Sequence, residues 1–280
     1  MKILAIGDTH GDSQSICNIA LPQADKHDIK TIIQCGDFGY WEHVDSGKRF
    51  LDSVSKHAVR RGIDIWWLDG NHENHPLLWD TYTPSGANGF CMIRENLWYM
   101  PRGSVFDLGN VRCMALGGAF SIDKGWRLNR ELMDRGHTML THEHQDSSIR
   151  EWAKERDGHT LWWPTEMITF EEANVAIEKA EASTKSIDIM FTHDVPEGVN
   201  VPGLHAADKW KYPETNQNRE LLREVFDAVQ PKLLVHGHYH TAYTGRLPLQ
   251  EEGWGCRVEG LANDGFQGFA IVLDLGLLFP

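Results

Sequence analysis

The sequence predicts an α/β fold with mixed sheets, and two observations lead to this class. Between residues 2 and 68, short β-rich runs alternate with helical stretches, which is the order that parallel β-α-β units require. From residue 242 onwards, short strands follow one another without a helix between them, which is typical of antiparallel pairing. We therefore expect one core that contains both parallel and antiparallel strands.

The first part of the chain supplies the β-α-β units. Asp12 and Ser13 precede the first helical stretch and are candidates to cap it. Each strand runs into a Gly-Asp or Asp-Gly pair, and glycine permits a sharp turn there. The expected elements are strands over 2–6, 31–35 and 63–68 and helices over about 14–26 and 45–61.

The later elements begin with a hairpin. Its turn is Gly109-Asn110, a pair that favours tight connections, between strands over 105–108 and 111–116. Pro231 ends the last long helix, because proline cannot continue it. The remaining expected elements are helices over 171–182 and 216–229 and strands over 187–191, 232–236, 242–246, 257–261 and 269–275.

We expect residues 1–280 to form a single domain, because no linker-like, repetitive or strongly charged stretch divides the chain. Residues 120–168 fit the strand and helix scheme poorly, since they are polar and rich in tryptophan. We interpret them as an elaborated loop and helix region over one face. The tryptophans of this region are Trp126, Trp152, Trp162 and Trp163.

The charge and apolar patterns limit the possible partners. The formal net charge is −13 and Lys and Arg form no dense cluster, which argues against duplex nucleic acid as the main partner. A phosphate substrate remains compatible, because bound metal ions can reverse the local charge. The apolar run 269–279 is interrupted by Asp274, so we expect a core strand and no membrane association.

The cysteines predict a cytoplasmic location. Their number, 5, is odd, and they are scattered without a C-x-x-C pair. This pattern indicates reduced thiols, which behave as small core hydrophobes. The N-terminal apolar run, residues 3–6, is too short for a signal peptide.

Side chains that commonly bind metals follow five of the predicted strands. Because the carboxyl ends of strands in open α/β sheets gather at one edge, we expect these segments to converge. Alternation along an extended chain places Asp8 and His10 on one face, and His238 and His240 likewise. Imidazole combined with carboxylate suits Mn, Fe or Zn better than Mg or Ca. The segments are Gly7-Asp8-Thr9-His10-Gly11, Gly36-Asp37, Gly70-Asn71-His72-Glu73, Thr192-His193-Asp194 and Gly237-His238-Tyr239-His240.

This series of motifs resembles that of the calcineurin-like metallophosphoesterases, and residues 117–127 and 162–164 are similar to stretches of bacterial and phage members. The resemblance implies a four-layer sandwich of two mixed β-sheets flanked by helices. It also implies two divalent metal ions bound by two ligand sets. The expected metals are Mn, Fe or both, with Zn as an alternative. One metal would be held by Asp8, His10, Asp37 and His240, and the other by Asn71, His193, His238 and the shared Asp37.

The implied activity is hydrolysis of a small-molecule or nucleotide phosphate ester by a hydroxide that bridges the two metals. His72, in the matching position, would act on the leaving group or stabilise the transition state. A phosphodiesterase is favoured over a phosphoprotein or monoester phosphatase. Phosphoprotein phosphatases carry a carboxylate and a phosphate-binding Arg in the second motif, where this chain has Tyr40 and Trp41. Glu42, Asp69 or another acid would then have to support His72.

Two further functions remain as alternatives. A nuclease is disfavoured by the acidic charge balance. A non-catalytic metal-binding scaffold would be expected to lose ligands, yet every ligand position is filled.

Four residues of the 120–168 region are candidate substrate contacts. Lys124, Arg127 and Arg130 are candidates to bind phosphate, and Trp126 is a candidate to stack on a base. The competing interpretation is a surface loop with one aromatic plug.

Several other polar residues in the sequence call for interpretation. His142 and His144 have metal-like spacing but read as a solvated helix terminus, and His236 as a core or supporting residue. Asp194 either orients His193 or starts a loop.

Overall fold

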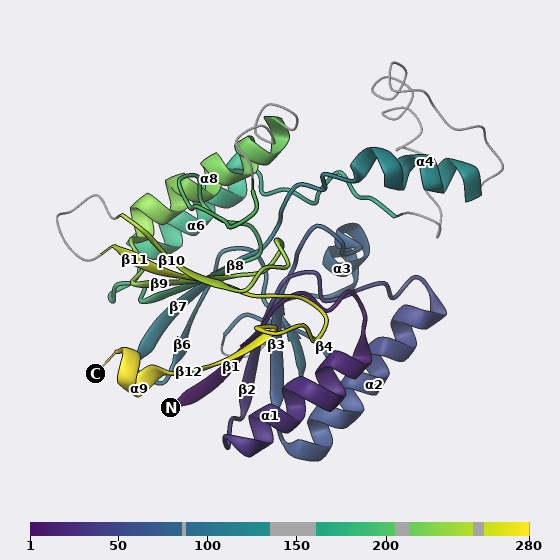
Figure 1. Cartoon of the computed structure of the whole chain (residues 1–280), viewed down its shortest axis with the longest axis horizontal. Coiled ribbons are helices and arrows are strands. Elements are labelled where there is room, and N and C mark those ends of the chain that lie inside the picture. The colour runs from purple at the N-terminus through teal and green to yellow at the C-terminus, as the bar shows by residue number, and fades with distance from the viewer. Residues whose placement is uncertain (86–87, 135–160, 205–212, 249–254, 280) are drawn as a thin grey trace.

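The structure is a computed structural model that describes residues 1–85, 88–134, 161–204, 213–248 and 255–279. Two six-stranded sheets pack face to face in this part of the chain, and helices cover both outer faces (Figure 1). The predicted α/β class and the implied four-layer sandwich are confirmed.

The first sheet has the strand order β12-β1-β2-β3-β5-β4. Strands β1, β2, β3 and β5 are parallel, whereas β12 and β4 pair antiparallel at the two edges. Its strands are β1 (Lys2–Ile6), β2 (Thr31–Cys35), β3 (Asp64–Leu68), β4 (Cys91–Arg94), β5 (Leu97–Tyr99) and β12 (Ala270–Asp274). Its helices are η1 (Ser15–Ala20), α1 (Leu21–Lys26), α2 (Asp45–Arg61) and α3 (His75–Thr81).

The second sheet has the order β10-β11-β9-β8-β7-β6. Its four central strands are parallel, and β10 and β6 are antiparallel edges. Its strands are β6 (Ser104–Leu108), β7 (Val111–Leu116), β8 (Ile189–Thr192), β9 (Leu233–His236), β10 (Tyr243–Leu247) and β11 (Cys256–Gly260). The remaining helices are α4 (Lys124–Asp134), α6 (Phe170–Glu181), α8 (Pro213–Val229) and α9 (Leu275–Leu278).

Three apolar clusters hold the layers together. One joins the first sheet to η1, α1, α2 and α3, and another joins the second sheet to α6 and α8. The third fills the space between the sheets, where Ile33 faces residues such as Phe191 and Val235. Burial of these side chains is the main force that fixes the sheets against each other.

Two local structures differ from the sequence-based expectation. The helix over 14–26 begins as a π-helical turn, η1, before α1, and Asp12 accepts from Gln14 N and Ser15 N at its start. The expected strand over 269–275 ends at Asp274, where the run turns into α9. The Asp274 carboxylate accepts from Gly276 N, and this cap favours a helix over a longer strand.

Three short elements, α3, β4 and β5, were not predicted by the sequence pattern. Strands of three or four residues offer too few alternating positions to be recognised. In the 120–168 region, residues 124–134 form α4, which projects from the body of the protein (Figure 1). Trp152 lies outside the described residues.

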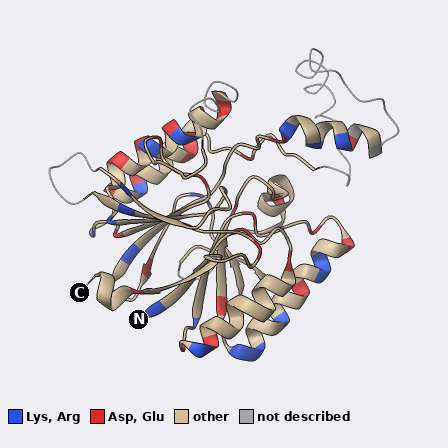
Figure 2. Ribbon diagram, viewed as in Figure 1, with Lys and Arg blue, Asp and Glu red and all other residues tan. Residues whose placement is uncertain are grey.

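The surface charges are mixed along the outer helices. Lys and Arg alternate with Asp and Glu on α2 and α8 (Figure 2). Among the described residues, no helix combines the length and the apolar character needed to cross a membrane.

Candidate metal centre

The five predicted segments converge where strands from both sheets end. Asp8, Asp37 and Asn71 follow β1, β2 and β3, while His193 and His238 follow β8 and β9. These strands lie side by side within their sheets, so their carboxyl ends meet at one edge of the sandwich. The structure thus brings together residues as far apart in sequence as Asp8 and His240.

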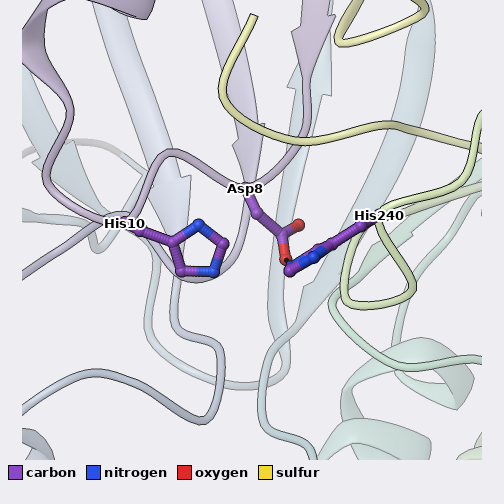
Figure 3. A group of neighbouring side chains, drawn as sticks. All are labelled: Asp8, His10 and His240. Atoms are coloured by element: carbon purple, nitrogen blue, oxygen red, sulfur yellow. Dashed lines mark ion pairs between the residues drawn. The ribbon is translucent and has the colours of Figure 1, made fainter. Parts of the chain in front are cut away.

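One group of donor atoms consists of Asp8, His10 and His240, within 4.8 Å of one another. Figure 3 shows the Asp8 carboxylate between the two imidazole rings. Asp8 is fully buried, and its Oδ2 lacks a hydrogen-bond partner although His240 Nε2 lies 3.0 Å away. A buried carboxylate oxygen without a donor is costly, and a cation at this point would satisfy it.

Asp37 lies at the centre of the other groups. Its Oδ2 is 3.4 Å from His193 Nε2, 3.5 Å from His10 Nε2 and 3.6 Å from His72 Nε2. Its Oδ1 accepts a hydrogen bond from His72 N at 2.9 Å. Burial opposes ionisation of Asp37, but the charges of His72 and His193 outweigh it and hold the pKa well below its usual range.

Asn71 and His238 complete the predicted ligand set. The Asn71 side-chain oxygen lies 3.0 Å from His193 Nε2, and its amide nitrogen donates to Ser121 Oγ at 2.8 Å. The His238 ring packs 4.9 Å from the His193 ring, between centroids. Among the described residues, His238 is outside the clusters of donor atoms within 4.8 Å of one another. It lines the same cavity as Asp37 and Asn71.

The backbone at this centre is held in an uncommon conformation. His10, Asp37, His238 and His240 have φ values of 42°, 53°, 69° and 53°, in the left-handed region. Non-glycine residues there store strain that the surrounding structure must overcome, and such residues cluster at functional sites. The fold therefore aims these side chains at one point at a conformational cost.

Glycines between the strands and the ligands allow the segments to approach one another closely. A Cβ atom on Gly70 would lie 2.2 Å from Asp37 Oδ1, and one on Gly237 would lie 2.2 Å from Asp8 Oδ1. Any larger residue would therefore push a neighbouring candidate ligand out of place.

Backbone and carboxylate acceptors orient two of the histidines. His193 Nδ1 lies 2.8 Å from Cys35 O, and His10 Nδ1 lies 2.9 Å from Asp264 Oδ2. A proton on each Nδ1 leaves Nε2 free to bind a cation. Burial lowers the pKa of His10, but Asp264 and Asp37 outweigh it and raise the pKa to about 11.

Asp264 is a site residue that the sequence analysis missed. It lies in the connection between β11 and β12, and its backbone N donates to Asp8 O at 2.9 Å. The segment Asn263-Asp264-Gly265 carries the small and polar residues of an ordinary turn, so only its position after a strand could have marked it.

His72 faces the centre and is held from two sides. Its carbonyl oxygen accepts from Trp41 Nε1 at 2.6 Å. Arg127 Nη2 lies 2.6 Å from His72 Nδ1 and also contacts His72 Nε2, while Arg127 Nε donates to Asp123. Burial lowers the pKa of His72 to about 4; Asp37 opposes this shift, and Arg127 adds to it.

The candidate substrate contacts occupy different positions. Arg127 is buried against His72, whereas Lys124 lies 4.4 Å from the Trp162 ring centroid in a cation–π contact. Trp126 is 65% exposed on α4 and Arg130 is exposed on the same helix. None of these four side chains lines the cavity. Of the four, only Arg127 is connected to the centre, through its contact with His72.

Neither acid considered for His72 contacts it. Glu42 accepts from Tyr40, Tyr82 and Arg94, and Asp69 accepts from Tyr99 and Arg102. Asp123 is linked to His72 through Arg127, which donates to Asp123 and contacts the His72 ring.

The structure gives contacts for Asp194 and His236, whose roles the sequence left open. Asp194 accepts from Val195 N, Asn218 and Tyr239, so it holds its own loop rather than His193. Both ring nitrogens of His236 have partners, at Gly237 O and the Tyr243 hydroxyl, which is consistent with a supporting role. His142 and His144 lie outside the described residues.

A cavity of about 520 Å³ opens onto the centre. Some of its lining residues are candidate ligands, and others come from the loop after β7 and from the start of α8. Its lining residues are His10, Asp37, Asn71, His72, Ile122, Asp123, Leu204, Thr215, Asn216, Arg219, His238, Tyr239 and His240.

The donor set fits divalent metal ions. Imidazole nitrogens, carboxylate oxygens and one amide oxygen suit Mn, Fe or Zn, and the buried Asp8 Oδ2 lacks a hydrogen-bond partner. Asp37 Oδ2 lies 3.5 Å from His10 Nε2 and 3.4 Å from His193 Nε2, so a cation held by either imidazole would also be within reach of this carboxylate. Paired cations beside a cavity are suited to displacement at a phosphoryl group.

Comparison with known proteins gives an independent result. The family model for calcineurin-like phosphoesterases matches residues 1–242. A search of curated proteins found no match.

Three solved structures match most of this chain at low sequence identity. A dimetal phosphatase from Danio rerio is 12% identical, with a TM-score of 0.52, over 94% of this chain and 88% of that one. GAP50, the anchor in the inner membrane complex of Plasmodium, is 11% identical over 93% and 70% of the chains, with a TM-score of 0.46. A phosphatase from Mycoplasma pneumoniae is 12% identical over 94% and 72%, with a TM-score of 0.37. The family match over most of the chain, together with the assembled donor set, leads to one conclusion: this chain belongs to the calcineurin-like phosphoesterases and is a metal-dependent phosphoester hydrolase.

Proposed function

We propose that the protein is a dinuclear phosphodiesterase that acts on small or nucleotide phosphodiesters. The observation that carries the proposal is the position of Asp37 Oδ2, within 3.6 Å of Nε2 of His10, His72 and His193. One cation would be held by Asp8, His10, Asp37 and His240, and the other by Asn71, His193, His238 and the shared Asp37. Mn or Fe is the proposed pair, with Zn as the alternative, because imidazole and carboxylate suit these metals.

Two bound divalent cations supply a hydroxide nucleophile and neutralise phosphoryl oxygens. The protein positions the phosphoryl group against the cavity wall formed by these ligands. His72 lies beside Asp37, where its ring, once protonated, can give a proton to the departing ester oxygen. Trp41 donates its indole N–H to His72 O at 2.6 Å and so fixes the backbone from which the ring projects.

Trp41 supports the preference for a diester. A dianionic monoester gains most from a guanidinium that binds two phosphoryl oxygens at once. At the corresponding place this chain has Trp41, whose indole is bound to His72 O. A diester carries one negative charge, which two cations can hold without a further guanidinium.

Arg127 supports a second candidate, a monoester phosphatase. Its guanidinium is buried, contacts His72 and is oriented by Asp123 at 2.9 Å. Turned toward the cavity, it would supply the cation that Trp41 does not. The two candidates therefore differ in whether Arg127 serves the substrate or His72.

The test compares kcat/KM with Mn for bis-nitrophenyl phosphate, nitrophenyl phosphate, a 2′,3′-cyclic nucleotide and a phosphopeptide. We expect the diesters to be hydrolysed faster than the monoesters. A phosphopeptide or simple monoester that is at least about tenfold better than both diesters would reject the phosphodiesterase and favour the second candidate. Arg127→Gln then separates the roles, because a substrate-binding Arg127 affects monoesters more than diesters.

We also propose a cytoplasmic location. All five cysteines are buried and free, which supports a reducing compartment. Measurement of the compartment with a tagged protein tests this directly.

A further inference from the structure

Arg219 is a buried cation that lines the same cavity as several candidate metal ligands. It is 2% exposed, and it comes from α8, which packs against the second sheet. Its Nη2 donates to Val199 O at 3.0 Å and to Pro196 O at 3.5 Å, and Glu197 Oε2 lies 3.7 Å away. Nη2 of the guanidinium is therefore occupied by contacts to the loop after β8.

The Nε–H of Arg219 has no such partner. It is buried and lacks a hydrogen bond, and Arg219 lines the cavity. Thr215, one turn earlier on α8, lines the same cavity, and its hydroxyl also lacks a hydrogen-bond partner. Buried donors are nearly always satisfied, so two neighbouring exceptions in a cavity wall indicate a missing acceptor.

The surroundings favour an anion as that acceptor. Thr215 lies in the first turn of α8, where the helix dipole favours negative charge. Hydrogen bonds from a guanidinium N–H or a hydroxyl to a phosphate oxygen are strengthened by the charge of the phosphate. Leu204 and Ile122 line the cavity as well and offer an apolar surface for the organic part of a ligand.

We propose that Arg219 and Thr215 form a subsite for a second phosphate of the substrate, away from the ester that is cleaved. The cavity continues from this subsite to Asp37 and His72, so one ligand can reach both ends. The inference rests on the proposed function for the ester that is cleaved. It adds the substrate class: nucleotide diesters that carry a further terminal phosphate.

The experiment uses a dinucleotide with a 5′-terminal phosphate, its 3′-phosphorylated isomer and the unphosphorylated dinucleotide, with Mn. The ester that is cleaved is the same in all three. We expect wild type to prefer one phosphorylated form by roughly ten- to a hundredfold in kcat/KM, the range for a hydrogen bond to a charged group. Arg219→Gln should bring this ratio close to one, and Thr215→Val should lower it by a smaller factor.

Arg223→Gln is the matched control. Arg223 lies one turn further along α8 and is paired with Asp227 at 2.8 Å, and it is not among the residues that line the cavity. This variant should keep the wild-type ratio. If Arg219→Gln fails to fold, Thr215→Val decides, since it removes a hydroxyl without changing the shape of the side chain.

Equal rates for all three dinucleotides in wild type, or an unchanged ratio in both variants, would overturn the subsite. A wild type that cleaves no dinucleotide but cleaves nucleoside monophosphates would reject the phosphodiesterase instead. The subsite is then tested on nucleoside 3′-monophosphate against nucleoside 3′,5′-bisphosphate with the same variants. Loss of the bisphosphate preference in Arg219→Gln would support it, and no preference in wild type would overturn it.

Discussion

The Asp264 carboxylate lies 2.9 Å from Nδ1 of His10 and so fixes which ring nitrogen of His10 faces Asp37. This contact joins the connection between β11 and β12 to the loop after β1. Carboxylates in this position orient a histidine ligand and increase its basicity. Asp264 is therefore part of the candidate metal centre, because it orients one of the candidate ligands.

Asp264→Asn should weaken metal binding by about ten- to a hundredfold, because the amide no longer fixes the His10 tautomer. The measurement is a Mn titration of metal-free protein against a chelator of known affinity. Asp274→Asn, at the cap of α9, is the control and should bind Mn as wild type does. Equal affinity in Asp264→Asn and wild type would contradict the orienting role.

Asp37→Ala should abolish turnover and reduce the bound metal at both positions, because Asp37 faces donors from every group at the centre. His240→Ala should weaken mainly the position that it shares with Asp8 and His10. Elemental analysis of purified variants gives the metal content for each. Two tightly bound metals and normal turnover in Asp37→Ala would show that the ligand assignment is wrong.

His72→Ala should keep near-normal metal content while turnover falls by about a hundred- to ten-thousandfold, as expected for loss of a general acid. The loss should shrink for nitrophenolate, which leaves without a proton. Paired kcat measurements on nitrophenyl and alkyl esters of the same phosphate class check this. Equal losses for both leaving groups would argue against proton donation by His72.

Gly237→Ala should destabilise the protein by about 1–3 kcal/mol and impair metal binding. The added methyl would lie 2.2 Å from Asp8 Oδ1 and 2.7 Å from Cys35 O. Gly276→Ala is the control, since its methyl would meet only Asp274 Oδ1 at 3.6 Å. Urea unfolding gives the free energy of unfolding of Gly237→Ala and of Gly276→Ala. Similar values for the two variants would contradict the steric argument.

Glu166→Gln should make the protein less sensitive to pH. Burial raises the pKa of Glu166 from 4.5 to about 7, although hydrogen bonds from Ser121 oppose the shift. The folded protein therefore holds this proton more tightly than the unfolded chain. This proton contributes about 3 kcal/mol to the free energy of unfolding. The contribution is fully present below pH 4.5 and is lost as the pH rises through 7.

The measurement is urea unfolding of metal-free wild type and Glu166→Gln at pH 4.5 and pH 8. From pH 4.5 to pH 8, the free energy of unfolding of wild type should fall by about 3 kcal/mol more than that of the variant. The exposed Glu220→Gln serves as the matched control. A constant difference between variant and wild type would show that Glu166 does not titrate in this range.

The sequence by itself determined the α/β class, the family resemblance and the succession along the chain of the segments that carry the candidate ligands. These features are local: strand periodicity, a glycine, and a carboxylate or imidazole directly after the strand. A local pattern can be read without knowledge of what packs against it. It fails for short elements such as β5, with three residues, and for the π-helix η1.

Only the tertiary structure decided which other side chains reach the centre. Lys124, Trp126, Arg127 and Arg130 are near neighbours in sequence, yet the direction of α4 brings Arg127 alone against His72. Asp264 contacts His10 because β12 pairs with β1 and returns the C-terminal part of the chain to the first sheet. Such contacts depend on strand order and packing between distant segments, which the residues beside each position do not encode.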